Sequence, residues 1–166
     1  MDRCNRSLRK YRSKIEDIVR IQVKEGREAI FFIYADGSTS EIIKGDNTSI
    51  SLSSEEEKRL RSNGEIVSSV HSHPSGFDPS TIDIMTGIMT KQNYMCVVTP
   101  AMTPDEKDDF VLTCVEMDQM SDVESQRLLR AMRRSSVGVT DVGRMLRKYG
   151  NLTRFNINGC RSQQIR

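Results

Sequence analysis

The two histidines of the chain, His71 and His73, stand two positions apart at the end of the segment EIVSSVHSHP. This segment is typical of a β-strand, in which side chains at i and i+2 point to the same face of the sheet. Two imidazoles on one face are well placed to bind a metal ion. Asp83 follows a loop rich in proline and glycine and lies in the first turn of a predicted helix. From that turn its carboxylate can reach back to the strand end, which predicts a metal site with two nitrogen ligands and one oxygen ligand.

This ligand set favours catalytic zinc. A catalytic zinc ion typically has three protein ligands and keeps its fourth position for water, whereas a structural zinc ion is closed by four ligands, often cysteines. No cysteine lies near the histidine pair in the sequence. Zinc lowers the pKa of bound water to about 7 and polarises a carbonyl group, but hydrolysis also needs a general base. We therefore expect a glutamate outside the ligand set to serve as that base.

The string HSHPSGFDPSTID resembles the metal-binding signature of the JAMM (MPN+) metalloproteases: an upstream Glu, then His-Ser/Thr-His, a loop, and Ser-x-x-Asp. The resemblance covers most of the chain. It implies that His71, His73 and Asp83 bind zinc. It also implies that Glu28 is the general base and that Ser80 helps to hold the tetrahedral intermediate. The fold implied is the JAB/MPN fold, which is cytidine-deaminase-like. The implied activity is hydrolysis of an amide bond at the C-terminus of a ubiquitin-like modifier, its precursor or its conjugate.

The loop that precedes Ser80 departs from the family pattern. Six residues, 74–79, separate His73 from Ser80, where the family usually has seven. Because Ser-x-x-Asp is intact, we expect a shortened loop. Restoring the usual count would move the two roles to Thr81 and Ile84, and an isoleucine side chain cannot bind a metal. The shortened loop also supports an alternative, an inactive MPN-type scaffold that binds protein partners.

Other interpretations of these residues stay open at the level of sequence. Glu41 and Glu65 compete with Glu28 for the role of general base, although Glu28 opens the first predicted strand, as in the family. Ser80 and Asp83 form a capping box that is expected at any helix start. The histidine pair is also compatible with two ordinary, partly buried side chains or with a structural zinc ion.

The elements that must position these side chains follow from apolar periodicity and turn signals. Before the histidine strand we expect a helix over residues 5–24 ended by Gly26, a hairpin over 28–46 with its turn at Asp36 and Gly37, a short strand in TSISLS (48–53) and a helix from Ser53 to Asn63. After the histidine strand we expect a helix from Ser80 to about Lys91, strands in NYMCVVTP and DFVLTCVEM, and a helix over 122–134. The apolar face of this last helix would consist of Val123, Leu128, Leu129 and Met132.

This order predicts an α/β (α+β) three-layer sandwich in which helices flank a mixed β-sheet. We expect residues 1–134 to form the metalloprotease domain. Residues 135–166 lack a strong apolar period and are expected to be a basic C-terminal extension. It would be partly flexible or contain a short helix from Thr140 to Gly150.

The formal net charge of +2 hides an uneven distribution. The first 125 residues hold 15 basic and 22 acidic residues, whereas the last 41 hold 10 basic and 1 acidic. The basic segment predicts one of three roles: a phosphate-contacting surface for nucleic acid, a solvated tail, or a segment that docks on the acidic body. RadC-type proteins share the histidine and Ser-x-x-Asp pattern and are linked to DNA processes, so the nucleic-acid role is also implied by resemblance.

Composition also bounds the location of the protein. The longest apolar run covers residues 30–35, far short of the roughly 20 residues of a membrane helix, so no membrane partner is expected. The basic N-terminus lacks the apolar segment of a signal peptide, which predicts a cytoplasmic protein. The four cysteines have no paired spacing and are expected to be buried thiols. The oligomeric state is not indicated.

Overall fold

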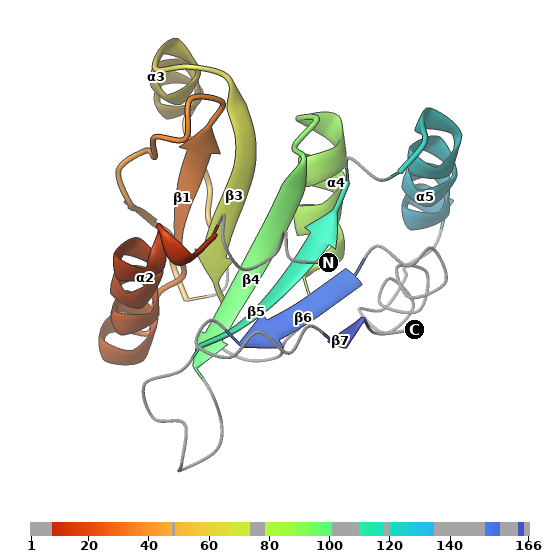
Figure 1. The fold of residues 1–166 in the computed structure, drawn as a ribbon. Coiled ribbons are helices and arrows are strands. Elements are labelled where there is room, and N and C mark those ends of the chain that lie inside the picture. The colour runs from red at the N-terminus through yellow and green to blue at the C-terminus, as the bar shows by residue number, and fades with distance from the viewer. Residues whose placement is uncertain are drawn as a thin grey trace.

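A mixed β-sheet organises the chain (Figure 1). The computed structural model describes residues 8–47, 49–73, 79–100, 110–117, 120–134, 152–156 and 163–164. Its strands, in chain order, are β1 Ala29–Tyr34, β2 Ile43–Lys44, β3 Ile66–Ser72, β4 Tyr94–Pro100, β5 Phe110–Glu116, β6 Leu152–Asn156 and β7 Gln163–Gln164. The strand order is β2-β1-β3-β4-β5-β6-β7, with β3 and β4 parallel and every other pair antiparallel. The predicted mixed α/β architecture is confirmed.

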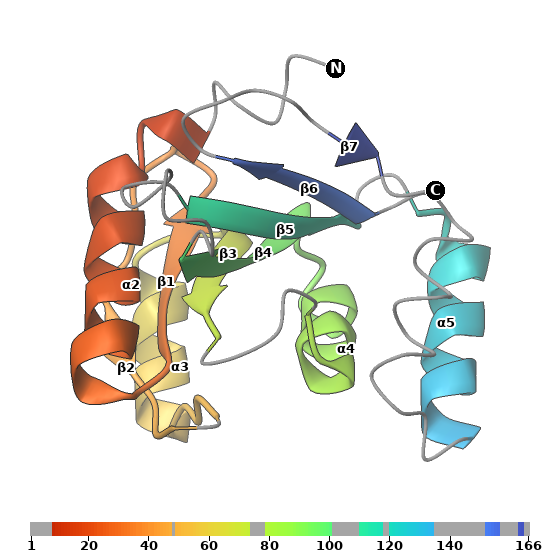
Figure 2. The same ribbon diagram turned by 90° about the horizontal axis from the view of Figure 1, so that it is seen from below.

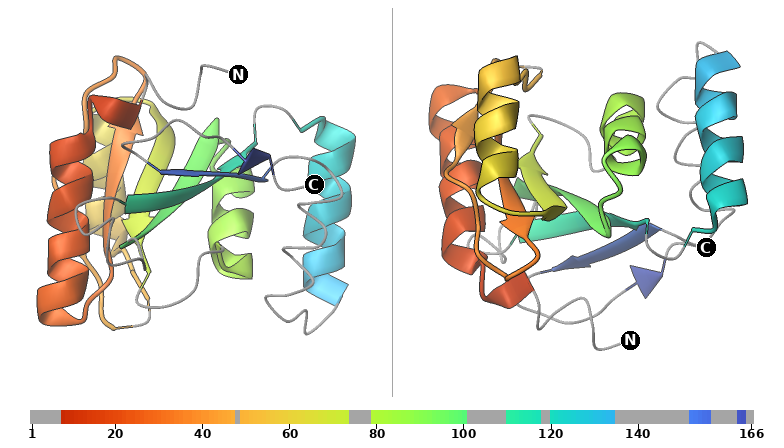
Figure 3. Two further views of the ribbon diagram at one scale, coloured as in Figure 1. Left: turned by 60° about the horizontal axis from the view of Figure 1, so that its bottom comes forward. Right: turned by 90° about the horizontal axis from the view of Figure 1, so that it is seen from above.

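Helices cover both faces of this sheet. They are α2 Arg12–Glu25, α3 Ser54–Ser62, α4 Thr81–Met89 and α5 Asp122–Arg134. Helix α2 packs on the face that carries Phe31, Val70 and Leu112, whereas Phe32 and Met95 point to the opposite face, where they pack with α3 and α4. Figures 2 and 3 show α4 and α5 on the same side of β4 and β5. None of these described helices is both long and apolar enough to cross a lipid bilayer.

The helix boundaries follow local sequence signals. Gly26 ends α2 in a left-handed conformation with φ of 65°, and its N–H donates to the carbonyl of Gln22. Helix α3 begins with a capping box in which the side chain of Ser53 accepts from the N–H of Glu56 and the Glu56 carboxylate accepts from Ser53. The predicted helix ends are thus confirmed, while the predicted start of the first helix at residue 5 lies outside the described residues.

The predicted hairpin is confirmed, but the predicted strand after it is wrong. Strand β1 pairs with β2 after a turn in which Gly37 has φ of 85°. The described part of TSISLS, residues 49–53, forms no strand. Ile50 and Leu52 nevertheless pack against the cluster of Phe32, Ile43 and Leu60. Their alternating apolar pattern reflects burial against this cluster rather than pairing with another strand.

The C-terminal region adds a strand that the sequence did not predict. Strand β6 pairs antiparallel with β5, from Val111 opposite Asn156 to Val115 opposite Leu152. The sheet therefore continues past residue 134, the predicted end of the metalloprotease domain, and that boundary stays a prediction. The expected short helix from Thr140 lies outside the described residues.

Helix α5 buries only part of its predicted apolar face. Leu128 and Leu129 are buried, and Leu128 packs with Ile84, Met95 and Val115. Val123, however, is 60% exposed, so its assignment to the buried face is wrong. Val123 lies in the first turn of the helix, and Met132, the fourth residue of the predicted face, lies outside the described side chains.

The expectation that all four cysteines are free thiols is also wrong. Cys96 on β4 lies directly opposite Cys114 on β5, and the two sulfurs are 1.98 Å apart in a disulfide bond. Both residues belong to the apolar cluster beneath α2. The pairing depends on the register of two strands, which residue spacing does not reveal.

This disulfide is expected to stabilise the fold measurably. It closes a loop with a sequence separation of 18, for which the chain-entropy model gives about 3 kcal/mol. Reduction under unfolding conditions, followed by refolding with the thiols blocked, should therefore lower the midpoint of thermal unfolding. A Cys4→Ser variant should keep this response to reduction, whereas four reactive thiols in unfolded, unreduced protein would contradict the assignment.

Candidate metal centre

The histidine pair lies at the end of a central strand. Val70 packs under α2 and the hydroxyl of Ser72 hydrogen-bonds to Gln22 of that helix, so His71 and His73 project from the opposite face. The N–H of His73 donates to the carbonyl of Val98, which continues the pairing with β4 by one residue. The prediction that both imidazoles share one face is confirmed.

Strand β3 is not an open edge. It pairs with β1 on one side and with β4 on the other (Figure 1). A substrate tail therefore cannot add to β3 by strand pairing, because the hydrogen-bonding groups of β3 are already used in the sheet.

Asp83 reaches the histidine pair from the first turn of α4. Its Oδ2 atom lies 3.4 Å from Nε2 of His71 and 3.3 Å from Nε2 of His73, and the two Nε2 atoms are 3.0 Å apart. The next residue, Ile84, is fully buried in the core beneath α4. With six residues between His73 and Ser80 in the sequence, it is Asp83, and not Ile84, that lies at the histidines.

The spacing of these three atoms fits a zinc ion. Ligands at about 2.0–2.1 Å in a tetrahedral zinc site stand about 3.3 Å from one another. The observed separations of 3.0, 3.3 and 3.4 Å match one triangular face of such a tetrahedron. Two imidazole nitrogens and one carboxylate oxygen are also a donor set that zinc accepts. The fourth corner has no protein ligand among the described residues, as in a catalytic site.

Neighbouring groups keep the Asp83 carboxyl ionised. Burial by itself raises the pKa of this carboxyl, but hydrogen bonds from His71, His73 and Ser80 outweigh that effect and hold the pKa well below its usual range. The carboxylate therefore stays ionised over the whole physiological range, as a metal ligand must.

Glu28 lies beside the histidines and not among them. Ile30 of β1 is directly opposite His71, and the antiparallel register places Glu28, two residues earlier, next to His73 on the same face. Glu28 is 7% exposed. Burial raises the pKa of its carboxyl, and the charges of His73 and His71 offset part of that rise. A carboxyl with a raised pKa next to a candidate metal site has the properties of a general base.

The rival glutamates lie elsewhere. Glu41 is exposed and forms an ion pair with Arg59 of α3. Glu65 is exposed before the first residue of β3, at the opposite end of the strand from the histidines. Of the three candidates, only Glu28 interacts with the histidine pair.

Ser80 is engaged with Asp83. Its hydroxyl donates to Oδ2 of Asp83 at 2.6 Å and accepts from the Asp83 N–H at 3.2 Å, while its own N–H donates to the same Oδ2 at 2.7 Å. The expected capping box is therefore present, and it orients the carboxylate. The role of Ser80 in holding a reaction intermediate stays a prediction.

A short loop that sequence reasoning overlooked holds Glu28 in place. The N–H of Glu28 donates to the carbonyl of Asp46, and the N–H of Gly45 donates to the carbonyl of Glu28, both at 2.7 Å. A Cβ atom on Gly45 would lie 2.1 Å from the carbonyl oxygen of Ser49, so only glycine fits. The available signal was the Gly-Asp pair at the end of the predicted hairpin.

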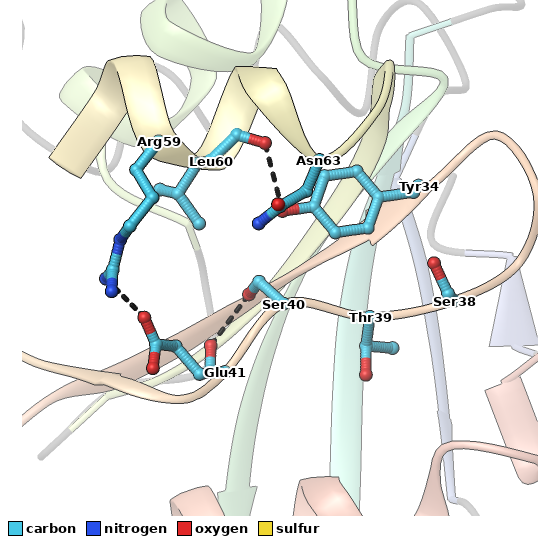
Figure 4. A pocket seen from close by; sticks show the side chains of 8 residues that line it. All are labelled: Tyr34, Ser38, Thr39, Ser40, Glu41, Arg59, Leu60 and Asn63. Atoms are coloured by element: carbon cyan, nitrogen blue, oxygen red, sulfur yellow. Dashed lines mark hydrogen bonds and ion pairs between the residues drawn. The ribbon is translucent and has the colours of Figure 1, made fainter.

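A separate polar cleft of about 380 Å³ lies between the hairpin and α3 (Figure 4). Several of its polar groups pair within the cleft: Tyr34 donates to the carbonyl of Leu60, Ser40 donates to the carbonyl of Glu41, and Arg59 pairs with the Glu41 carboxylate. Of the residues considered for the site, only Glu41 lines it, and Glu41 does not interact with the histidine pair. The cleft is therefore distinct from the metal centre.

Comparison of the chain with models of known families, with curated proteins and with solved structures found no match.

Proposed function

We propose that the protein is a zinc-dependent metallopeptidase of the JAMM type, with His71, His73 and Asp83 as zinc ligands and Glu28 as general base. The observation that supports this most directly is the triangle of ligand atoms with sides of 3.0, 3.3 and 3.4 Å. The buried Glu28 beside the triangle adds the proton acceptor that hydrolysis requires. The corresponding proposal for the fold is the JAB/MPN arrangement of sheet and helices.

The residues of the chain divide the work of amide hydrolysis. When bound, zinc supplies Lewis acidity that polarises the substrate carbonyl and makes water more acidic. Glu28 accepts a proton from a water molecule while the oxygen of that water forms a bond to the carbonyl carbon of the substrate. Glu28 then returns this proton to the amine nitrogen as the C–N bond breaks, so that the products are a carboxylic acid and an amine. Ser80 orients Asp83 through the capping box.

The proposed substrate is an amide bond at the C-terminus of a ubiquitin-like protein, joined to a lysine side chain or to a peptide. This substrate class rests on the resemblance of the HSHPSGFDPSTID string to the JAMM signature. Hydrolysis of such a modifier joined through its C-terminal carboxyl to a fluorescent amine tests it directly. Release of the amine that requires zinc supports the proposal, and no release from any modifier tested argues for the scaffold.

Zinc content separates the enzyme from the inactive scaffold. We expect protein purified at neutral pH to contain about one zinc ion per chain by elemental analysis, since all three ligands are already in place. A chelator should remove both the zinc and the hydrolytic activity, and added zinc should restore them. Absence of zinc at neutral pH would favour the scaffold, which the shortened loop before Ser80 also supports.

Two further expectations remain proposals. Binding of nucleic acid would use the basic segment after residue 134, and it should weaken steeply with salt if phosphates are contacted. A cytoplasmic location would be unusual for a protein with a disulfide between Cys96 and Cys114, because such bonds are rare in the cytosol. Blocking free thiols in intact cells before lysis would show whether this bond is present there.

A further inference from the structure

Two buried polar atoms next to the metal centre have no hydrogen-bond partner among the described residues. They are Nδ1 of His71 and Oγ1 of Thr99. The residues are 3% and 7% exposed, respectively. Because the large majority of buried polar side-chain atoms in proteins are hydrogen-bonded, often to ordered water, two such atoms in one region need an explanation.

The two residues lie on the same face of neighbouring strands. His71 of β3 is directly opposite Val97 of the parallel strand β4, so Thr99 is two residues further along, beside His73. Cys96 and Val98 pack beneath α2, which directs Thr99 to the other face of the sheet, the face of the histidines. Thr99 therefore belongs to the surroundings of the metal centre, although it offers no ligand to the triangle.

The position of His71 explains why its Nδ1 atom needs a partner. Its Nε2 atom faces His73 and Asp83 and is the proposed metal ligand. A neutral imidazole that binds a metal through Nε2 carries its proton on Nδ1. In metal sites this N–H almost always donates to a carboxylate, a backbone carbonyl or a water molecule, which sets the tautomer and the orientation of the ring.

We propose that Thr99 is a positioning residue of the metal centre, linked to Nδ1 of His71 through one internal water molecule. Residues diagonally opposite on neighbouring strands are about 7–8 Å apart, with the Cβ atoms somewhat closer, a separation that an imidazole, one water and a hydroxyl can span. Buried waters typically bond to polar groups that are otherwise unsatisfied, as both of these atoms are. The link would hold His71 in the tautomer that leaves Nε2 available to zinc.

The alternative is a hydroxyl that is simply buried without a partner. Valine has nearly the same shape as threonine, so in that case Thr99→Val would remove an unfavourable buried polar group. Zinc binding would then be unchanged, and the metal-free protein would be as stable as wild type or more stable. If the water link exists, the same change removes one of its anchors. The two explanations therefore predict different zinc affinities for this one variant.

The test measures zinc affinity by competition with a chromophoric chelator. We expect Thr99→Val to weaken zinc binding about 10- to 100-fold, the usual effect of losing an outer partner of a ligand. Thr99→Ser keeps the hydroxyl and should restore most of the affinity. Thr113→Val is the matched control, because Thr113 is a buried threonine on the same face of β5, one strand further from the histidines. It should leave zinc affinity unchanged even if the stability of the fold falls.

A second measurement does not depend on zinc. Nitrogen NMR of the metal-free protein reports which ring nitrogen of His71 is protonated, and we expect the Nδ1–H form to lose population in Thr99→Val but not in Thr99→Ser. Thr99→Val with wild-type zinc affinity and an unchanged tautomer would overturn the inference. This inference rests on the proposed zinc site, but separate results would refute the two proposals. Wild-type protein that binds no zinc would refute the proposed function, whereas normal zinc binding by Thr99→Val would refute only the role of Thr99.

Discussion

Replacing Glu28 by Gln is expected to lower the rate of amide hydrolysis by about 10²- to 10⁴-fold, the usual contribution of a general base. Glutamine keeps the size of the side chain but cannot accept the proton from water. Zinc content should stay at the wild-type level, because Glu28 is not a member of the ligand triangle. Hydrolysis of the modifier amide and elemental analysis of the same samples measure both quantities.

The stability of this variant provides a further check. Burial raises the pKa of Glu28 in the folded protein above its value of about 4.3 in an unfolded chain, so its ionisation favours unfolding as pH rises through this range. In metal-free protein at pH 7, Glu28→Gln should therefore unfold at the same temperature as wild type or a higher one. The gain should disappear below about pH 4, where the carboxyl is protonated in both states.

Glu41→Gln and Glu65→Gln are the matched controls for this experiment. Both residues are exposed, and neither interacts with the histidine pair. They should hydrolyse the substrate at the wild-type rate. Wild-type activity in Glu28→Gln, or its loss in either control, would show that the base is assigned to the wrong residue.

Replacing Asp83 by Asn is expected to lower zinc affinity by at least about 100-fold, more than the loss of an outer partner costs. The amide keeps the shape of the side chain and can still accept from the Ser80 N–H at the start of α4. It lacks the negative charge that the two histidines approach at 3.3 and 3.4 Å. Chelator competition measures the affinity, and circular dichroism confirms that the helix is retained.

Glu56→Gln offers the control for this change. Glu56 occupies in α3 the capping-box position that Asp83 occupies in α4, but it faces no histidine. Its replacement removes a carboxylate from an equivalent first turn and should leave zinc affinity as in wild type. If Asp83→Asn bound zinc as tightly as Glu56→Gln, the carboxylate would be a helix cap only.

Much of the fold could be predicted from local patterns. The apolar and β-branched runs of β1, β3, β4 and β5 and the caps at Ser53 and Ser80 depend on neighbours within a few residues, and the structure confirms them. The strand predicted in TSISLS was wrong because an alternating pattern records burial and does not require a pairing partner. Strand β6 was missed because its pairing with β5 is a long-range interaction.

Part of the candidate site also follows from local patterns, and part depends on long-range packing. The spacing of His71 and His73 on a strand dictates a shared face, since side chains alternate with a period of two. The Ser-x-x-Asp capping box dictates that Asp83 lies in a first turn. Sequence alone left three glutamates in competition, and the register of β1 on β3 favours Glu28.

The ligand and base candidates, the caps and strands that carry them, and the uneven charge of the two ends of the chain could all be derived from the order of the amino acids. Three contacts became known only from the folded chain: Asp83 with the histidines, Cys96 with Cys114, and Thr99 beside His73. The two groups differ in the sequence distance over which the interactions act. A cap or an alternation is set by neighbouring residues, whereas these contacts depend on strand register and helix placement, which the packing of the whole core selects.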